Sequence, residues 1–211
     1  EYNNARMQAG AGRVHVPRLP YVVDNALAAT HGVRELVLVG AKSPVSFFAY
    51  PGKPSVLIEE GGNVTGVATV AHDLEHALEA LAAELGATST SPAHVNDRRS
   101  GPLPTGPITV EGLAAVLAAT LPENAVVCDE SVSTGRNFSA AMAHAAPHDW
   151  LNIMGGSIGW ALPGAVGAAI GAPDRKVIAL EGDGSGMYTL QALWTMAREN
   201  LDVTVVVLAN R

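Results

Sequence analysis

The sequence predicts an α/β fold in which parallel sheets are covered by helices on both faces. Short apolar runs rich in Val, Ile and Leu alternate with segments of helical periodicity, most regularly after residue 108. These runs are nearly continuous instead of alternating with polar residues, which is typical of strands buried on both faces. The alternation of strand and helix indicates parallel pairing with helical crossovers.

The first part of the chain contains few predicted elements. The sequence before about residue 30 is irregular and extended, because it is interrupted by prolines. Residues 35–40 (ELVLVG) predict a buried parallel strand, and residues 55–58 predict a weaker one. Residues 73–85 predict an amphipathic helix, since four leucines fall on one face and Gly86 can take the left-handed cap conformation.

The second part of the chain predicts a regular series of strands and helices. Thr109 is a suitable N-cap for the first of these helices. The predicted helices cover residues 109–120, 137–145, 162–170 and 188–199, and the predicted strands cover residues 125–128, 150–153, 176–180 and 203–208.

A segment with the composition of a linker separates these two parts. Residues 87–107 are rich in Ser, Thr, Pro and Gly and have no apolar period, which is typical of an interdomain connection. We place the boundary near residue 92, giving domains at residues 1–92 and 93–211.

Composition excludes several classes of function. The net charge is -7, and Lys and Arg do not cluster, which argues against a nucleic-acid partner. No apolar run reaches the length of about 18 residues that suggests a membrane span, and no signal-peptide core is visible, so we expect a cytoplasmic protein without membrane contact. Cys128 is the single cysteine and is expected to be a small buried hydrophobic residue.

The glycine-rich segment EGDGSG lies between a predicted strand and a predicted helix. Its glycines allow close approach of a ligand, and the N–H groups at the following helix start favour an anion. Asp183 would repel a phosphate unless a cation lay between them, and Mg²⁺ with oxygen ligands is the usual solution. The next strand ends at Asn210, whose amide oxygen is a second candidate ligand. A dinucleotide-binding site is disfavoured, because GDGSGM does not fit the spacing G-x-G-x-x-G.

The segment from Gly182 to Asn210 resembles the thiamine-diphosphate signature of the pyruvate decarboxylase, benzoylformate decarboxylase and acetolactate synthase family. That signature is GDG followed, after a fixed spacing, by a strand ending in Asn-Asn. In this chain 25 residues, 185–209, separate Gly184 from Asn210, which matches the family spacing. The resemblance implies that Asp183 and Asn210 bind Mg²⁺.

The same resemblance assigns the remaining residues of this segment. Gly182, Gly184 and Ser185 would belong to the cofactor-binding loop. The first asparagine of the family is replaced here by Ala209, a position that is not a metal ligand in the family. The third protein ligand of the family, a backbone carbonyl two residues after the second asparagine, would lie beyond Arg211.

Two other loops resemble the family. The stretch GGSIGWALP is similar to the one that meets the middle of the cofactor, which implies that the Gly156 carbonyl accepts a hydrogen bond from the aminopyrimidine and that Ile158 is the wedge that bends the cofactor. Bending brings the exocyclic amine near the thiazolium carbon and makes proton abstraction intramolecular. The loop DESVST matches E-[ST]-x-[ST], which implies that Ser133 contacts the diphosphate, with Ser131 as a further candidate.

The resemblance implies a function for a longer protein. This would be thiamine-diphosphate- and Mg²⁺-dependent decarboxylation or carboligation of a small 2-oxo acid, with this chain supplying the diphosphate and metal site. Residues 1–92 would be the later part of the central domain, where some relatives bind FAD although no residue here requires it, and residues 93–211 would be a cofactor domain truncated at its C-terminal end. Both domains would therefore be incomplete thiamine-diphosphate-enzyme domains.

The activating glutamate of the family lies in a domain absent from this sequence. We therefore expect the isolated chain to be inactive and the full-length form to be a homodimer or tetramer. The alternative is a non-catalytic α/β subunit or truncated assembly module of such an enzyme. The choice of 2-oxo acid, and that between decarboxylase and carboligase, stays open.

The segment HDLEH at residues 72–76 matches the H-x-x-E-H pattern of one class of zinc protease. In a continuous helix, His72 and His76 would lie on one face, as zinc requires. We nevertheless favour a solvated helix face, because the sequence offers no evident third ligand.

Overall fold

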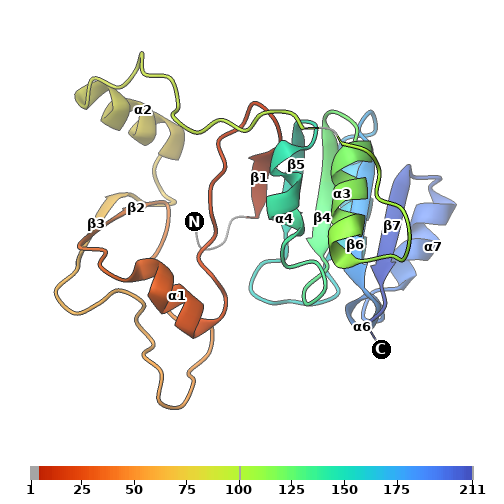
Figure 1. Ribbon diagram of the computed structural model, residues 1–211, viewed down its shortest axis with the longest axis horizontal. Coiled ribbons are helices and arrows are strands. Elements are labelled where there is room, and N and C mark those ends of the chain that lie inside the picture. Colours follow the sequence, from red (N-terminus) through yellow and green to blue (C-terminus); the bar gives the residue numbers. More distant parts are fainter. Residues whose placement is uncertain (1–4, 100, 211) are drawn as a thin grey trace. The chain divides into compact units, whose positions relative to one another are not determined.

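The computed structural model describes residues 5–99 and 101–210, which form two units (Figure 1). The first unit covers residues 17–92. The second combines residues 5–16 with the described residues from 93 onward. Within the described residues, no helix is long and apolar enough to cross a membrane.

The first unit contains two helices and a small parallel sheet. Its elements are α1 (Val23–Thr30), β2 (Glu35–Val39), β3 (Asn63–Ala68) and α2 (Leu74–Glu84). Strands β2 and β3 pair in parallel, so the predicted parallel strand at residues 35–40 is present. The prediction that it is buried is wrong, because none of its residues is fully buried and Val37 is 55% exposed.

The prediction of a second strand at residues 55–58 is wrong. This segment makes only an isolated bridge, between Val45 and Val56. Leu57 is apolar because it packs with Val23 and Ala26 of α1. The true partner of β2 is β3 (NVTGVA), which is exposed along most of its length and therefore lacks the apolar run by which a buried strand is recognised.

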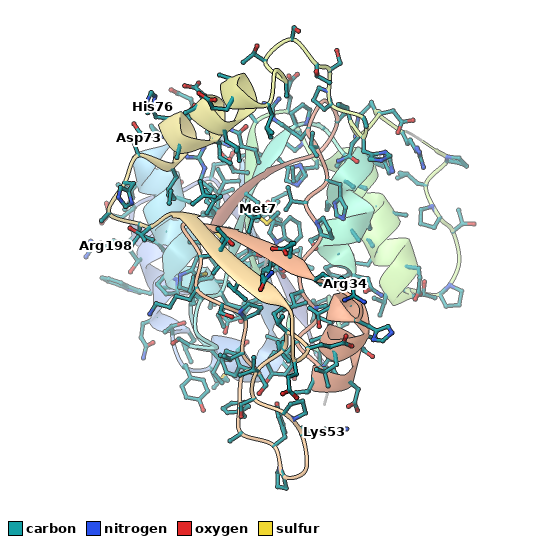
Figure 2. The ribbon with its side chains drawn as sticks, turned by 90° about the vertical axis from the view of Figure 1, so that its left-hand side faces the viewer. Met7, Arg34, Lys53, Asp73, His76 and Arg198 are labelled. Atoms are coloured by element: carbon teal, nitrogen blue, oxygen red, sulfur yellow. The ribbon has the colours of Figure 1, made fainter. Side chains whose placement is uncertain are left out.

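Helix α2 confirms the predicted helix at residues 73–85. The Asp73 carboxylate caps it by accepting a hydrogen bond from the His76 N–H at 3.0 Å, and Figure 2 labels both residues at the start of the helix. Gly86 follows with φ +65°. His72 lies before the cap, and its Nδ1 accepts a hydrogen bond from the Thr69 N–H at 3.0 Å. The helical i, i+4 arrangement expected for His72 and His76 is therefore wrong.

The second unit is built on a five-stranded sheet with the order β1-β5-β4-β6-β7. The four strands after β1 pair in parallel, whereas β1 pairs antiparallel with β5. Its strands are β1 (Arg6–Ala9), β4 (Ala125–Glu130), β5 (His148–Asn152), β6 (Val177–Gly182) and β7 (Val203–Leu208). Its helices are α3 (Val110–Thr120), α4 (Phe138–Ala141), η1 (Met142–His144), α5 (Ala161–Gly171), α6 (Asp183–Gly186) and α7 (Gln191–Arg198).

Helices cover both faces of this sheet, which confirms the predicted α/β fold class. On one face Val127, Trp150 and Leu180 pack with residues of α3 and α4. On the other face, residues such as Cys128 and Ala179 pack with α5 and α7. Cys128 is fully buried, and burial raises the pKa of its thiol to about 12, so the thiol stays protonated and acts as a core residue.

Two predicted helices are shorter in the structure. The segment predicted at residues 137–145 forms the four-residue α4 and then the 3₁₀ turn η1, and it ends before Pro147, which disfavours helix in the residue preceding it. The helix predicted from residue 188 begins at Gln191. The preceding residues continue from α6 through turns that include a hydrogen bond from the Thr189 N–H to the Gly186 carbonyl at 3.3 Å.

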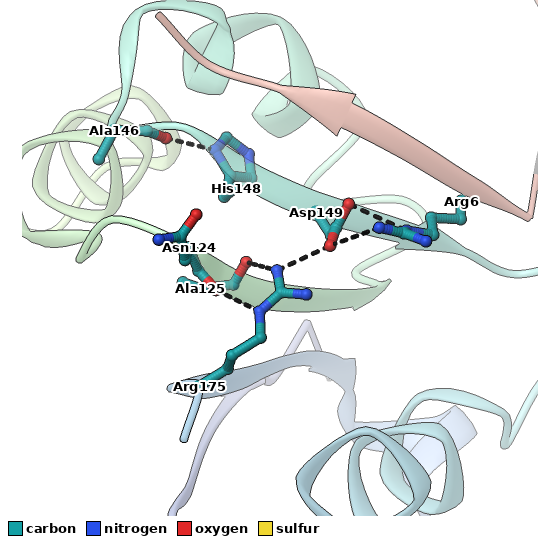
Figure 3. A network of polar contacts seen from close by, with 7 residues as sticks. All are labelled: Arg6, Asn124, Ala125, Ala146, His148, Asp149 and Arg175. Atoms are coloured by element: carbon teal, nitrogen blue, oxygen red, sulfur yellow. Dashed lines mark hydrogen bonds and ion pairs between the residues drawn. The ribbon is translucent and has the colours of Figure 1, made fainter. Parts of the chain in front are cut away.

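Strand β1 was not predicted, and it belongs to the second unit although we expected all of residues 1–92 in the first. Arg6 forms two hydrogen bonds to the buried Asp149 carboxylate, at 3.0 and 3.1 Å (Figure 3). Arg175 contacts the same carboxylate at 2.7 Å and donates to the Asn124 carbonyl at 2.6 Å. Local sequence cannot reveal this strand, because its partner β5 lies more than 100 residues further along the chain.

Candidate functional site

A cleft opens at the carboxyl ends of β4, β6 and β7. The strand register explains it, because Glu130 pairs with Glu181 and Gly182 pairs with Leu208, so the loops after these strands start at the same level. The cleft has a volume of about 220 Å³. Its lining residues are Ser131, Val132, Ser133, Thr134, Ile158, Gly182, Asp183, Gly184, Ser185, Leu208 and Asn210.

Asp183 and Asn210, the two predicted metal ligands, both line this cleft. Asp183 is the first residue of α6, directly after β6, and Asn210 follows β7. The Asn210 Nδ2 donates a hydrogen bond to the Ser133 Oγ at 3.1 Å. This bond occupies the amide nitrogen and leaves the amide oxygen available as an acceptor.

The two serines of the loop after β4 differ in orientation. Ser131 is buried, and its N–H and Oγ donate to Asp129 Oδ1 at 3.0 and 2.5 Å. Ser133 is exposed and bonded to Asn210. Its hydroxyl is therefore the more accessible of the two to a ligand in the cleft.

Val132, between these serines, has φ +35° and is half exposed. A positive φ is a genuine outlier for a β-branched residue, and such conformations cluster at functional sites. Val132, Thr134 and Leu208 line the cleft but were not predicted as site residues. The E-[ST]-x-[ST] motif could have indicated the first two by adjacency, since all its residues share one short loop.

The glycine-rich loop before α5 contributes only one of its two predicted residues to the cleft. Gly155, Gly156 and Gly159 have φ values of +64°, +67° and +88°, a region that glycine adopts without steric cost. Ile158 is 46% exposed and lines the cleft. Gly156 does not line it, and its carbonyl accepts a hydrogen bond from the Ile158 N–H at 3.1 Å.

Two buried glutamates lie beneath the cleft, and the sequence analysis gave neither a role. Glu130 and Glu181 are each 1% exposed and occupy paired positions on adjacent strands. Burial raises the pKa of Glu181, a hydrogen bond from Ser185 opposes the rise, and the neighbouring Glu130 carboxylate adds to it. Their signal in the sequence was a glutamate that follows an apolar run, directly or after one residue, at a depth where a buried ionisable group needs a specific partner.

The lining of the cleft suits a metal-bridged anion better than a directly bound one. None of its lining residues is Lys or Arg, and Asp183 is its only carboxylate. Among the described residues, no three His, Cys, Asp or Glu side chains gather around one point. A cation here would therefore depend on Asp183, amide or backbone oxygens and the anion itself, a ligand set that suits Mg²⁺. Gly184 leaves room, since a Cβ built there would meet no atom within 4 Å.

Comparisons with known proteins give one match to the part of the chain that forms the cleft and several matches to nearly the whole chain. Residues 133–211 match the family model described as thiamine pyrophosphate enzyme, C-terminal TPP binding domain. A Mycobacterium tuberculosis protein named "Putative acetolactate synthase large subunit IlvX" is 48% identical over 204 residues, which are 97% of this chain and 39% of that protein. An alpha-keto-acid decarboxylase of Mycolicibacterium paratuberculosis is 32% identical over 213 residues, covering 95% of this chain and 36% of that protein.

A solved structure resembles the chain over nearly its whole length. It is the thiamine diphosphate-dependent 4-hydroxybenzoylformate decarboxylase of Rhodococcus jostii RHA1, with a TM-score of 0.68 and 27% sequence identity. The match covers 92% of this chain and 39% of that protein. The chain thus spans about two fifths of the length of the relatives it matches.

Proposed function

We propose, because the chain belongs to the thiamine pyrophosphate enzyme family, that its cleft holds the diphosphate end of thiamine diphosphate through a Mg²⁺ ion. Asp183 and Asn210 would supply the metal ligands from the protein. Ser133 would contact the diphosphate, and Ile158 would face the middle of the cofactor. Ser131 would hold the loop in place through Asp129, which is a narrower role than the direct contact expected from the sequence.

One observation carries this proposal. Asp183 and Asn210 follow adjacent parallel strands and line one cleft, where Asn210 also bonds to Ser133. A single carboxylate without a neighbouring Lys or Arg would repel a diphosphate. A divalent cation that binds the carboxylate, the amide oxygen and phosphate oxygens removes this repulsion.

For the whole protein we propose decarboxylation or carboligation of a small 2-oxo acid. The relatives described above support this proposal, because their names state acetolactate synthesis or 2-oxo acid decarboxylation. Thiamine diphosphate, when bound, supplies the carbanion that attacks a 2-oxo acid. The residues of this chain would bind and orient the cofactor. Three expectations stay predictions: a cytoplasmic location, a homodimer or tetramer, and a boundary of the cofactor domain near residue 92.

Isothermal titration calorimetry of residues 1–211 with thiamine diphosphate tests the proposal. Heat of binding is expected with Mg²⁺ and should disappear when the metal is chelated. Thiamine without phosphate serves as the matched ligand control and should bind at least about tenfold more weakly, since it lacks the anchored group. Absence of binding in the presence of Mg²⁺ would favour the alternative, a non-catalytic assembly module.

A further inference from the structure

Glu130 is the last residue of β4, and its buried carboxylate is bonded entirely to backbone N–H groups of another segment. Its Oε1 accepts from the Gly159 N–H at 2.5 Å. Its Oε2 accepts from the Trp160 and Ala161 N–H groups at 2.6 and 2.7 Å. No ion pair of the described residues involves Glu130, so these N–H groups compensate the buried charge.

These bonds give α5 a cap that its own sequence does not supply. The N-cap residue of α5 is Trp160, which provides no side-chain cap hydrogen bond. The first N–H groups of a helix need an acceptor, and a carboxylate at this end also interacts favourably with the helix dipole. Glu130 meets both needs from a different strand.

We call the three hydrogen bonds from Gly159, Trp160 and Ala161 to Glu130 the Glu130 clamp. At one end of this clamp, Gly159 is hydrogen-bonded through both its N–H and its carbonyl. The Gly159 N–H is bound by Glu130, and its carbonyl accepts from the Thr189 Oγ1 at 2.7 Å. A Cβ on Gly159 would lie 2.7 Å from the Tyr188 Cβ, so a residue with a side chain at position 159 would clash with the segment between α6 and α7. Ile158, its direct neighbour, lines the cleft.

The other end of the clamp belongs to the proposed diphosphate loop. Glu130 is followed directly by Ser131 to Thr134, all of which line the cleft. A single side chain thus joins the loop facing the diphosphate to the loop carrying Ile158.

We infer that Glu130 is a positioning residue that fixes Ile158 relative to the diphosphate loop and so sets the pose of the part of the cofactor beyond the diphosphate. This inference rests on the proposed function. It distinguishes two halves of the ligand, because Asp183 and Asn210, which follow β6 and β7, do not depend on Glu130 to hold a metal-bound diphosphate.

The test compares two ligands in one protein. Residues 1–211 carrying Glu130→Gln are titrated with Mg²⁺–thiamine diphosphate and with Mg²⁺–pyrophosphate, which occupies only the diphosphate half. The amide of Gln presents one acceptor and one donor to three N–H groups, so we expect affinity for thiamine diphosphate to fall about tenfold, the equivalent of one lost charge-assisted bond. Affinity for pyrophosphate should stay within about twofold. Glu111→Gln, an exposed glutamate in the first turn of α3, is the matched control.

Hydrogen–deuterium exchange reads the clamp without any ligand. The amides of Gly159, Trp160 and Ala161 should exchange faster in Glu130→Gln, while those of β4 keep their protection. Should Glu130→Gln not fold, Thr189→Val removes the second hold on Gly159 and should produce the same ligand selectivity with a smaller loss, about threefold.

The outcomes separate the two proposals. If Glu130→Gln lowers the affinity for both ligands equally, Glu130 is only a structural helix cap. If neither the affinities nor the amide exchange rates change, the clamp is refuted. If the unmodified chain binds neither ligand with Mg²⁺, the proposed function itself fails, and the positioning role fails with it.

Discussion

At the amino edge of the five-stranded sheet the buried Asp149 carboxylate is paired with two arginines, whereas at the carboxyl edge the Asp183 carboxylate lines an open cleft. The amino edge has the larger cavity, of about 440 Å³. Arg6 and Arg175 in its wall are nevertheless both paired with Asp149. At the carboxyl edge, Asp183 has no ion-pair partner among the described residues. We therefore base the proposed site on the state of the polar groups in the cavity wall and not on cavity size.

If the two edges differ in this way, removing the charge of Asp183 should change the affinity for thiamine diphosphate and leave the stability of the fold unchanged. Asp183→Ala is expected to lower Mg²⁺-dependent affinity for thiamine diphosphate about 100-fold, because the metal loses its only carboxylate ligand from the cleft. Calorimetry measures the affinity, and the thermal unfolding midpoint should hardly move. Asp174→Ala, an exposed carboxylate at the amino edge, is the matched control, and a comparable loss of affinity there would abolish the contrast.

Removing a charge from the amino edge should lower stability and leave cofactor affinity unchanged. Asp149→Asn is expected to lower the free energy of unfolding of the second unit by about 2 kcal/mol, since the partly buried Arg175 loses its counter-ion. All three tryptophans, Trp150, Trp160 and Trp194, lie in this unit, so their fluorescence follows its unfolding. Affinity for thiamine diphosphate should not change. A stable variant that binds the cofactor weakly would reverse the assignment of the two edges.

The pH dependence of this effect follows from the pKa of Asp149. Burial by itself raises this pKa, but hydrogen bonds and charge from Arg6 and Arg175 outweigh it, so the net pKa lies below the ordinary value of 3.8. A lowered pKa contributes stability that is present above pH 3.8 and is lost as the pH falls through the folded-state pKa. The difference between the wild type and Asp149→Asn should therefore shrink in acid.

The smallest expected effect concerns the buried layer beneath the cleft. Because burial raises the pKa of Glu181 above its ordinary value of 4.5, its contribution to stability is complete below pH 4.5 and is lost as the pH rises through the folded-state pKa. Glu181→Gln should remove this slope, and tryptophan-detected unfolding at several pH values would measure it. A wild type and variant with parallel pH profiles would show that Glu181 titrates alike in both states.

The parts of the structure that the sequence predicted are those governed by local pattern. Apolar runs identified β4, β6 and β7, and the spacing from Asp183 to Asn210 matched a family signature. Adjacent parallel strands then bring the two residues to one edge. This inference needs only strand order and direction, both of which the alternation of strand and helix indicates.

The parts that were missed depend on distant partners. Strand β1 is four residues long and forms only through β5, and β3 is mostly exposed. Glu130 resembled an ordinary motif residue, because the N–H groups that it binds lie about 30 positions away. The contact expected between Gly156 and the aminopyrimidine stays a prediction. The Ile158 N–H uses one lone pair of the Gly156 carbonyl, and a carbonyl oxygen has a second.

The loop after β4 is closed by Gly135, whose N–H donates to the Ser131 carbonyl at 3.2 Å. A Cβ at this position would lie 1.9 Å from the Ser131 Oγ and 2.8 Å from the Phe138 ring. Neither neighbour can withdraw easily, since Ser131 is tied to Asp129 and Phe138 is fully buried. A side chain at position 135 would therefore displace Ser131 or Phe138, so the loop that presents Ser133 to the cleft keeps its shape only with glycine at this position.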